Sequence, residues 1–178
     1  MADQSESAFN ASCEANQMKI EDLSDELKGL VIAQQNWLAS TTHFVKQGDV
    51  YINIDQAFKE EFKDLIEKLN HPKSTQVTLF RTKDSNKPTR VHDSRLKRIL
   101  YMYPLRILHG PAKVHSDYPG MQGSISKDIR VGTCIIFHDR VFVDGVLEFL
   151  IIGVPRQDSR EIEHTKKGEK VEEKPHVL

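Results

Sequence analysis

The chain has 178 residues, of which 38% are hydrophobic and 29% are charged, and its formal net charge is −1. This length predicts one domain of ordinary size. The longest strongly apolar stretch, residues 141–154, contains two acids and is too short to span a bilayer, and no signal-peptide pattern opens the chain. We therefore expect an intracellular protein, cytoplasmic or nuclear, that is neither secreted nor membrane-spanning.

The two ends of the sequence are poor in apolar residues. Residues 1–16 are acidic and polar, and residues 157–178 are charged and polar, so neither segment can bury enough surface to offset the entropy of ordering. We predict two disordered tails around a single domain at 17–156. Cys13 falls in the first tail and Cys134 in an apolar run, which argues against a disulfide and favours a reducing compartment.

Residues 18–38 predict a helix with one apolar stripe. The stripe has heptad-like spacing, and its members are Ile20, Leu23, Leu27, Leu30 and Trp37. Two interpretations are open. The helix packs on its own domain, or it forms a short coiled coil through these five residues and makes the chain a homo-oligomer.

The next segments predict a strand at 50–54, a helix at 56–69 capped by Asp55, and a strand at 76–81. Residues 93–103 favour a short helix that ends before Pro104.

Residues 105–108 suggest another strand, and the glycines and prolines of 109–123 predict a long surface loop. Asp144-Gly145 is the dipeptide that two-residue hairpins prefer. It predicts that 134–143 pairs with 146–154, with Val143 opposite Val146. The expected fold class is therefore α+β: two N-terminal helices and an antiparallel sheet with a central C-terminal hairpin.

No pattern in the sequence identifies a catalytic or metal-binding residue. Gly-x-Ser-x-Gly and Walker A motifs do not occur. On a strand, Cys134 and His138 would lie about 13 Å apart, too far to share one ion. We expect no metal or other cofactor, and an enzyme is the less favoured interpretation. A small metal-dependent hydrolase stays open through one compact acidic group: Asp139, Asp144 and Glu148.

Positive charge is concentrated in residues 73–113, which carry ten bases and two acids. Cations neutralise phosphates and aromatic rings can stack on unpaired bases, so this basic block predicts contact with RNA or DNA. The candidate residues are Arg81, Lys83, Lys87, Arg90, Arg95, Lys97, Arg98, Tyr101, Arg106 and Lys113. The block could equally be a solvated face, or could meet an anionic membrane surface or an acidic protein.

The sequence therefore predicts a non-enzymatic, self-associating protein that binds nucleic acid with little sequence specificity through the basic block. A small α+β core with loose ends and a cationic surface also resembles the small matrix proteins of plant rhabdoviruses. That resemblance implies the alternative: a structural or adaptor protein that docks to an anionic membrane or a protein partner.

Overall fold

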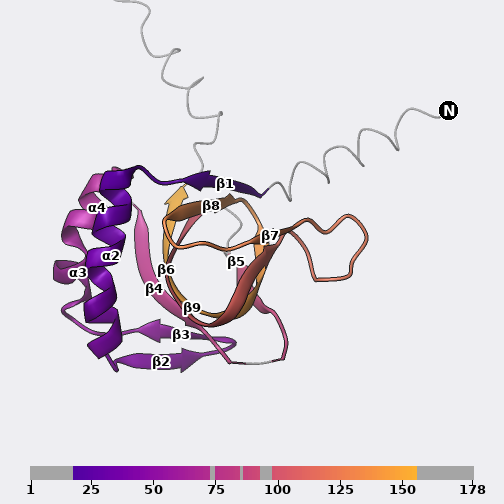
Figure 1. Ribbon diagram of the computed structural model, residues 1–178, viewed down its shortest axis with the longest axis horizontal. Coiled ribbons are helices and arrows are strands. Elements are labelled where there is room, and N and C mark those ends of the chain that lie inside the picture. Colours follow the sequence, from indigo (N-terminus) through magenta and orange to yellow (C-terminus); the bar gives the residue numbers. More distant parts are fainter. Residues whose placement is uncertain (1–17, 73–74, 85, 93–97, 156–178) are drawn as a thin grey trace, which may run out of the picture.

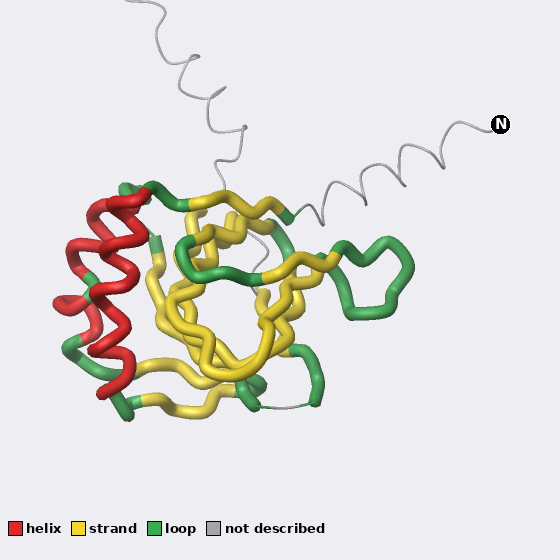
Figure 2. Tube along the Cα trace, viewed as in Figure 1, coloured by secondary structure: helices red, strands yellow, loops and turns green. Residues whose placement is uncertain are grey.

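A computed structural model of the protein describes residues 18–155, apart from 73–74, 85 and 93–97 (Figure 1). Both predicted tails lie outside the described residues. Within them, one antiparallel sheet of nine strands dominates and three helices lie to one side (Figures 1 and 2). The predicted α+β class is therefore wrong, because the protein is mostly sheet. None of the described helices is long and apolar enough to cross a membrane.

The helices are α2 (Asp25–Ser40), α3 (Phe58–Glu61) and α4 (Lys63–Leu69). The strands are β1 (Lys19–Asp22), β2 (Phe44–Gln47), β3 (Val50–Asn53), β4 (Gln76–Thr82), β5 (Thr89–His92), β6 (Arg98–His115), β7 (Ser126–Asp128), β8 (Thr133–Phe137) and β9 (Arg140–Pro155).

Strands β6 and β9 organise the sheet. They pair along almost their whole length, from Arg98 opposite Pro155 to His115 opposite Phe142, with three shifts of register on the way. In the first half of β6, the order of strands is β1-β8-β6-β9-β4-β3-β2; further along, β7 pairs with β6 and β5 with β9. The two long strands curl, so the end of the sheet that carries β5 and β7 folds back towards the end that carries the other strands (Figure 2).

The predicted C-terminal hairpin is wrong. Strand β9 continues through Asp144 and Gly145, and Val143 pairs with Val114 and Thr89 rather than with Val146. Gly145 has φ +98°, and a side chain there would place its Cβ 3.0 Å from the Cα of Ala112. The glycine is therefore needed where β9 passes close to an irregular stretch of β6.

The large sheet has two apolar faces. The face covered by the helices, called the helix face below, includes the fully buried Leu38, Phe62, Leu65, Leu79, Leu105, Leu150 and Ile152. The opposite face, called the concave face, is lined by Leu100, Met102, Ile135, Phe137, Phe149 and Ile151. Successive residues of a strand point to opposite faces, so β4 and β9 contribute alternate side chains to both cores.

The predicted N-terminal helix begins later than expected, since residues 19–22 form β1, and Ser24 caps α2 by accepting a hydrogen bond from the Leu27 amide. Ile20 lies on β1 opposite Ile135. The other members of the stripe, Leu23, Leu27, Leu30 and Trp37, pack against the helix-face core. The coiled-coil prediction is wrong because the stripe packs inside the protein. That the chain is a homo-oligomer stays a prediction.

Three further elements differ from expectation. The predicted helix 56–69 is divided into α3 and α4 at Phe62, whose ring lies edge-on to Trp37. The predicted helix at 93–103 is wrong from residue 98, which begins β6, and residues 93–97 lie outside the described chain. The predicted loop 109–123 is strand as far as His115.

Candidate functional site

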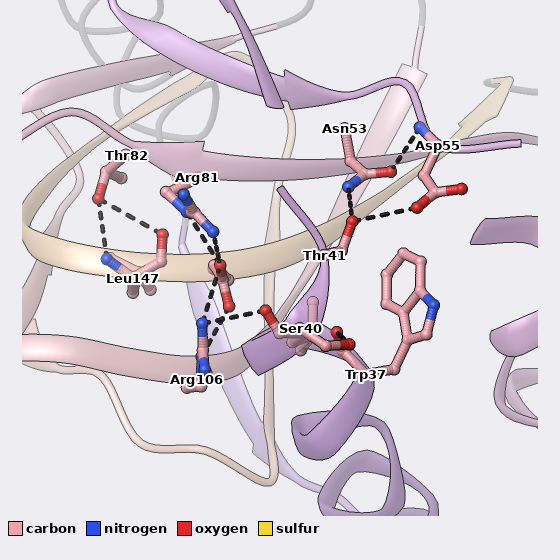
Figure 3. Close-up of polar contacts among 11 residues, drawn as sticks. Trp37, Ser40, Thr41, Asn53, Asp55, Arg81, Thr82, Arg106 and Leu147 are labelled. Atoms are coloured by element: carbon pink, nitrogen blue, oxygen red, sulfur yellow. Dashed lines mark hydrogen bonds and ion pairs between the residues drawn. The ribbon is translucent and has the colours of Figure 1, made fainter. Parts of the chain in front are cut away.

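Two arginines of the basic block are used inside the protein. Arg81 Nε donates to Glu148 Oε1 at 2.9 Å, and Arg106 Nε donates to Glu148 Oε2 at 2.8 Å. Arg106 also donates to the backbone oxygen of Leu38 at the end of α2, and Arg81 lies 3.9 Å over the ring of Phe44. Figure 3 shows the two guanidinium groups converging on one acidic side chain. Glu148 is fully buried, so these arginines compensate a charge that burial would otherwise make costly.

The other members of the block are spread over different parts of the fold. Lys83, Arg90 and Lys113 are exposed on separate segments, and Lys87 is exposed in the loop before β5. Tyr101 is half-buried, with its ring 4.5 Å from that of His71. Arg95 and Lys97 lie outside the described residues. Arg98 is directed towards the concave face, as shown below.

The acidic group predicted for a hydrolase does not form one site. Glu148 belongs to the buried cluster with Arg81 and Arg106. Asp144 Oδ2 lies 2.8 Å from His115 Nε2, and Asp139 pairs with Arg140 at 3.4 Å. Across the described parts of the chain, no three His, Cys, Asp or Glu side chains are grouped so that they could hold a metal ion.

Cys134 is part of a polar group on the helix face. Burial raises its pKa to about 12, despite a contact with Tyr103 that lowers it. Burial also raises the pKa of Tyr103, whose hydroxyl lies 2.7 Å from His71 Nε2, and burial lowers the pKa of His71. At neutral pH these effects keep the thiol protonated and the imidazole uncharged, which does not suit a nucleophile.

The concave face holds a cavity of about 690 Å³. Its floor consists of Ile52, Thr78, Phe80, Leu100, Phe149 and Ile151. The rings of Phe80 and Phe149 are stacked, 5.6 Å apart and 19° from parallel. Strand β5 and the turn between β2 and β3 also border the cavity, through Val91 and Gly48. The structure therefore leaves an apolar hollow on a face that the helices do not cover.

The polar groups of the cavity come from both ends of the floor. At one end, Arg98 Nη1 donates to Gln76 Oε1 at 2.5 Å beside Gly153. Arg90, His92 and Asp49 also line the cavity, from β5 and from the turn that precedes β3. Two arginines and one carboxylate give this described lining a cationic balance, which favours an anionic ligand.

Sequence reasoning named Arg98 and Arg90 but missed the residues that form the hollow around them. Gln76, Phe149 and Gly153 lie in segments predicted to be strands. Gly153 offered one signal, since glycine within an apolar strand often marks a place where another group approaches closely.

Comparison with known proteins gives remote structural likenesses. No family model and no curated protein matches the sequence. An oxidoreductase of the 2OG-Fe(II) oxygenase family from Burkholderia pseudomallei shares 12% identity over 87% of this chain and 92% of its own, with a TM-score of 0.48. A prolyl-4-hydroxylase from Pseudomonas putida shares 12% over 84% and 98%, also with a TM-score of 0.48.

The match to HEPD from Streptomyces albus, solved with 2-hydroxyethylphosphonate and Fe(II), has 11% identity and a TM-score of 0.36. It covers 54% of this chain, which spans about a fifth of that protein, 21% of its length. At these identities and TM-scores the likenesses do not establish a family. The described residues of this chain also do not fit an iron centre, because no metal-binding group is found among them.

The prediction of a non-enzymatic nucleic-acid-binding protein is wrong. The physical reason lies in the basic block, since Arg81 and Arg106 neutralise Glu148 instead of facing a partner. The matrix-like alternative is wrong as well, because it assumed a small α+β core with a cationic surface, whereas the described chain is mostly sheet and uses two of those cations internally.

Proposed function

We propose that the protein binds a small organic ligand with a flat apolar body in the concave-face cavity. The observation that carries the proposal is the floor, where the stacked rings of Phe80 and Phe149 border a hollow of about 690 Å³. Ligand sites are concave, largely apolar and typically about 300–1,000 Å³ in volume. A flat molecule would replace water over the half-buried Phe80, whose ring stacks on the fully buried Phe149, and would bury apolar surface on both partners.

Methyl NMR of the full chain tests this proposal with two probes of the same shape, naphthalene-2-carboxylate and naphthalene-2-carboxamide. We expect the signals of Ile52, Leu100 and Ile151 on the concave face to shift. The signals of helix-face methyls, Leu38, Leu65 and Ile152, should stay in place because these side chains are sealed beneath the helices. The proposal is overturned when neither probe shifts the concave-face methyls.

A filling variant gives a second test. Thr78 is half-buried in the floor, so Thr78→Phe would place a ring inside the hollow and should weaken binding of either probe by at least about tenfold, or 1.4 kcal/mol. Thr42→Phe is the matched control, because Thr42 is exposed in the segment between α2 and β2. Equal binding by both variants would place the ligand elsewhere.

A further inference from the structure

We infer that Arg98, lying across Gly153 and held by Gln76, anchors a carboxylate of the ligand. This inference rests on the proposed function and names the chemical class of the molecule. It assigns one of the arginines of the basic block to anion recognition at one end of the cavity, and it gives Gly153 the role of leaving room for that arginine.

The register of the sheet brings the three residues together. Gln76 on β4 lies opposite Gly153 on β9, and Gly153 lies opposite Leu100 on β6. Arg98 is two residues before Leu100, so its side chain emerges on the same face of β6. From there it crosses β9 and reaches the side-chain oxygen of Gln76 at 2.5 Å.

Gly153 makes this crossing possible. A Cβ at position 153 would lie 3.0 Å from Arg98 Cδ and 3.5 Å from Arg98 Nη1. Arg98 therefore crosses β9 at Gly153, where the strand has no side chain in the way. A side chain at 153 would crowd Arg98 Cδ and make the arginine shift.

The charge of Arg98 has a neutral partner. Among the described residues its one polar side-chain contact is the amide of Gln76, and no carboxylate pairs with it. A guanidinium carries five N–H donors, and this contact uses one of its nitrogens. The planar fork of an arginine matches a carboxylate in two parallel hydrogen bonds, so the remaining donors can bind an acid group while Gln76 fixes the orientation.

The length of the floor defines the rest of the ligand. Alternate residues of a strand are about 6–7 Å apart. The row of Gln76 and Gly153 is followed by Thr78 and Ile151, and then by the stacked Phe80 and Phe149. A carboxylate on Arg98 thus places a flat body of about two fused rings over the second and third rows. The carboxylate of Asp49 belongs to the end of the cavity away from Arg98, because Asp49 adjoins Val50, which pairs with Thr82 at the opposite end of β4.

Affinities of the two naphthalene probes for the full chain test the anchor. We expect the carboxylate to bind at least about tenfold more tightly than the amide, as a charge-assisted pair predicts. Arg98→Gln should abolish this preference, because it removes the charge that favours the acid over the amide, and Arg98→Lys should retain part of the preference. Gly153→Ala should lower the preference less than Arg98→Gln does, because the added methyl crowds Arg98 Cδ without removing the charge.

Arg130→Gln is the matched control for charge, since Arg130 is exposed and lies away from the cavity lining. It should leave the preference intact. Equal binding of acid and amide at the concave-face methyls would overturn the carboxylate anchor while the proposed function stands. A preference that survives in Arg98→Gln would also overturn the anchor. Absence of any methyl shift with either probe would overturn both proposals.

Discussion

The helix face and the concave face are built from the same strands but differ in how far some of their side chains are buried. On β4, Leu79 is fully buried under the helices, whereas its neighbours Thr78 and Phe80 are half-buried on the other side. On β9, Leu150 and Ile152 are sealed, and the next residue, Gly153, borders the cavity. Alternation supplies both faces with side chains, but α2 and α4 cover one face, whereas half-buried side chains of the other face border the cavity.

The arginines show the same contrast. Arg81 and Arg106 hold a fully buried carboxylate near the end of α2, whereas Arg98 reaches a neutral amide at the rim of a cavity. The basic block thus contains two arginines that neutralise a buried carboxylate and one arginine, Arg98, whose remaining N–H donors are not used in the described contacts. The partner of each arginine, rather than the local density of charge, decides its role.

The largest expected effect comes from the buried carboxylate. Glu148→Gln would leave two guanidinium groups without a counter-charge, and breaking a buried pair on one side costs about 3–5 kcal/mol. Urea denaturation should show this loss in the free energy of unfolding. Arg98→Gln should change that free energy by less than about 0.5 kcal/mol. Similar losses in the two variants would contradict the division between structural and available arginines.

The two faces should also differ in sensitivity to truncation. Leu79→Ala would open a void in a fully buried site, at a cost of about 3 kcal/mol. The adjacent Thr78→Ala removes a side chain that borders a hollow already present, so we expect a loss of about 1 kcal/mol or less, set mainly by strand propensity. Denaturation midpoints of the pair measure the difference. Equal losses would mean that the concave face is as tightly packed as the helix face.

The close passage of β9 over β6 gives a smaller effect. Gly145→Ala places a methyl group against Ala112 at positive φ and should cost about 2 kcal/mol. Gly29→Ala in α2 is the control, because nothing lies within 4 Å of a side chain there, and it should stabilise the protein by about 1 kcal/mol. A neutral Gly145→Ala would show that the strands separate at this point.

Local patterns predicted some elements of this fold. Alternating side chains identified strands where the structure has β3 and β4, and the apolar stripe after Asp55 indicated the region of α3 and α4. Asp144-Gly145 misled because positive φ at a glycine serves a hairpin turn and an irregular strand equally well. The sequence around the dipeptide does not reveal which of the two occurs.

Long-range pairing explains the other errors. Glu148 is 67 residues from Arg81 and 42 from Arg106, so no window of sequence could assign those arginines to an ion cluster. The cavity likewise depends on register, which places Gln76 opposite Gly153 across β4 and β9. Strand β6, which separates β8 from β9, was divided in prediction by Pro104 and by the glycine and proline that follow His109.

The smallest expected effect is the absence of a reaction at Cys134. Its thiol is buried on the helix face with a pKa raised to about 12, so very little thiolate forms at pH 8. In a Cys13→Ser background, a thiol reagent should leave the folded chain unlabelled and react once urea unfolds it. Adding the exposed Thr42→Cys gives a control thiol that should react at once.

The raised pKa of the Cys134 thiol also predicts that the stability of the fold depends on pH. A raised pKa means that the fold favours the protonated thiol, so this contribution is complete below the pKa of an unfolded cysteine, about 8.5. It is lost as the pH rises towards about 12, the value in the folded chain. Tyr103, whose pKa burial also raises, should add to this alkaline loss. The labelling experiment has one outcome that would contradict the contrast between the two faces. If Cys134 in the folded chain reacts as fast as the Thr42→Cys control, the helices do not seal their face of the sheet.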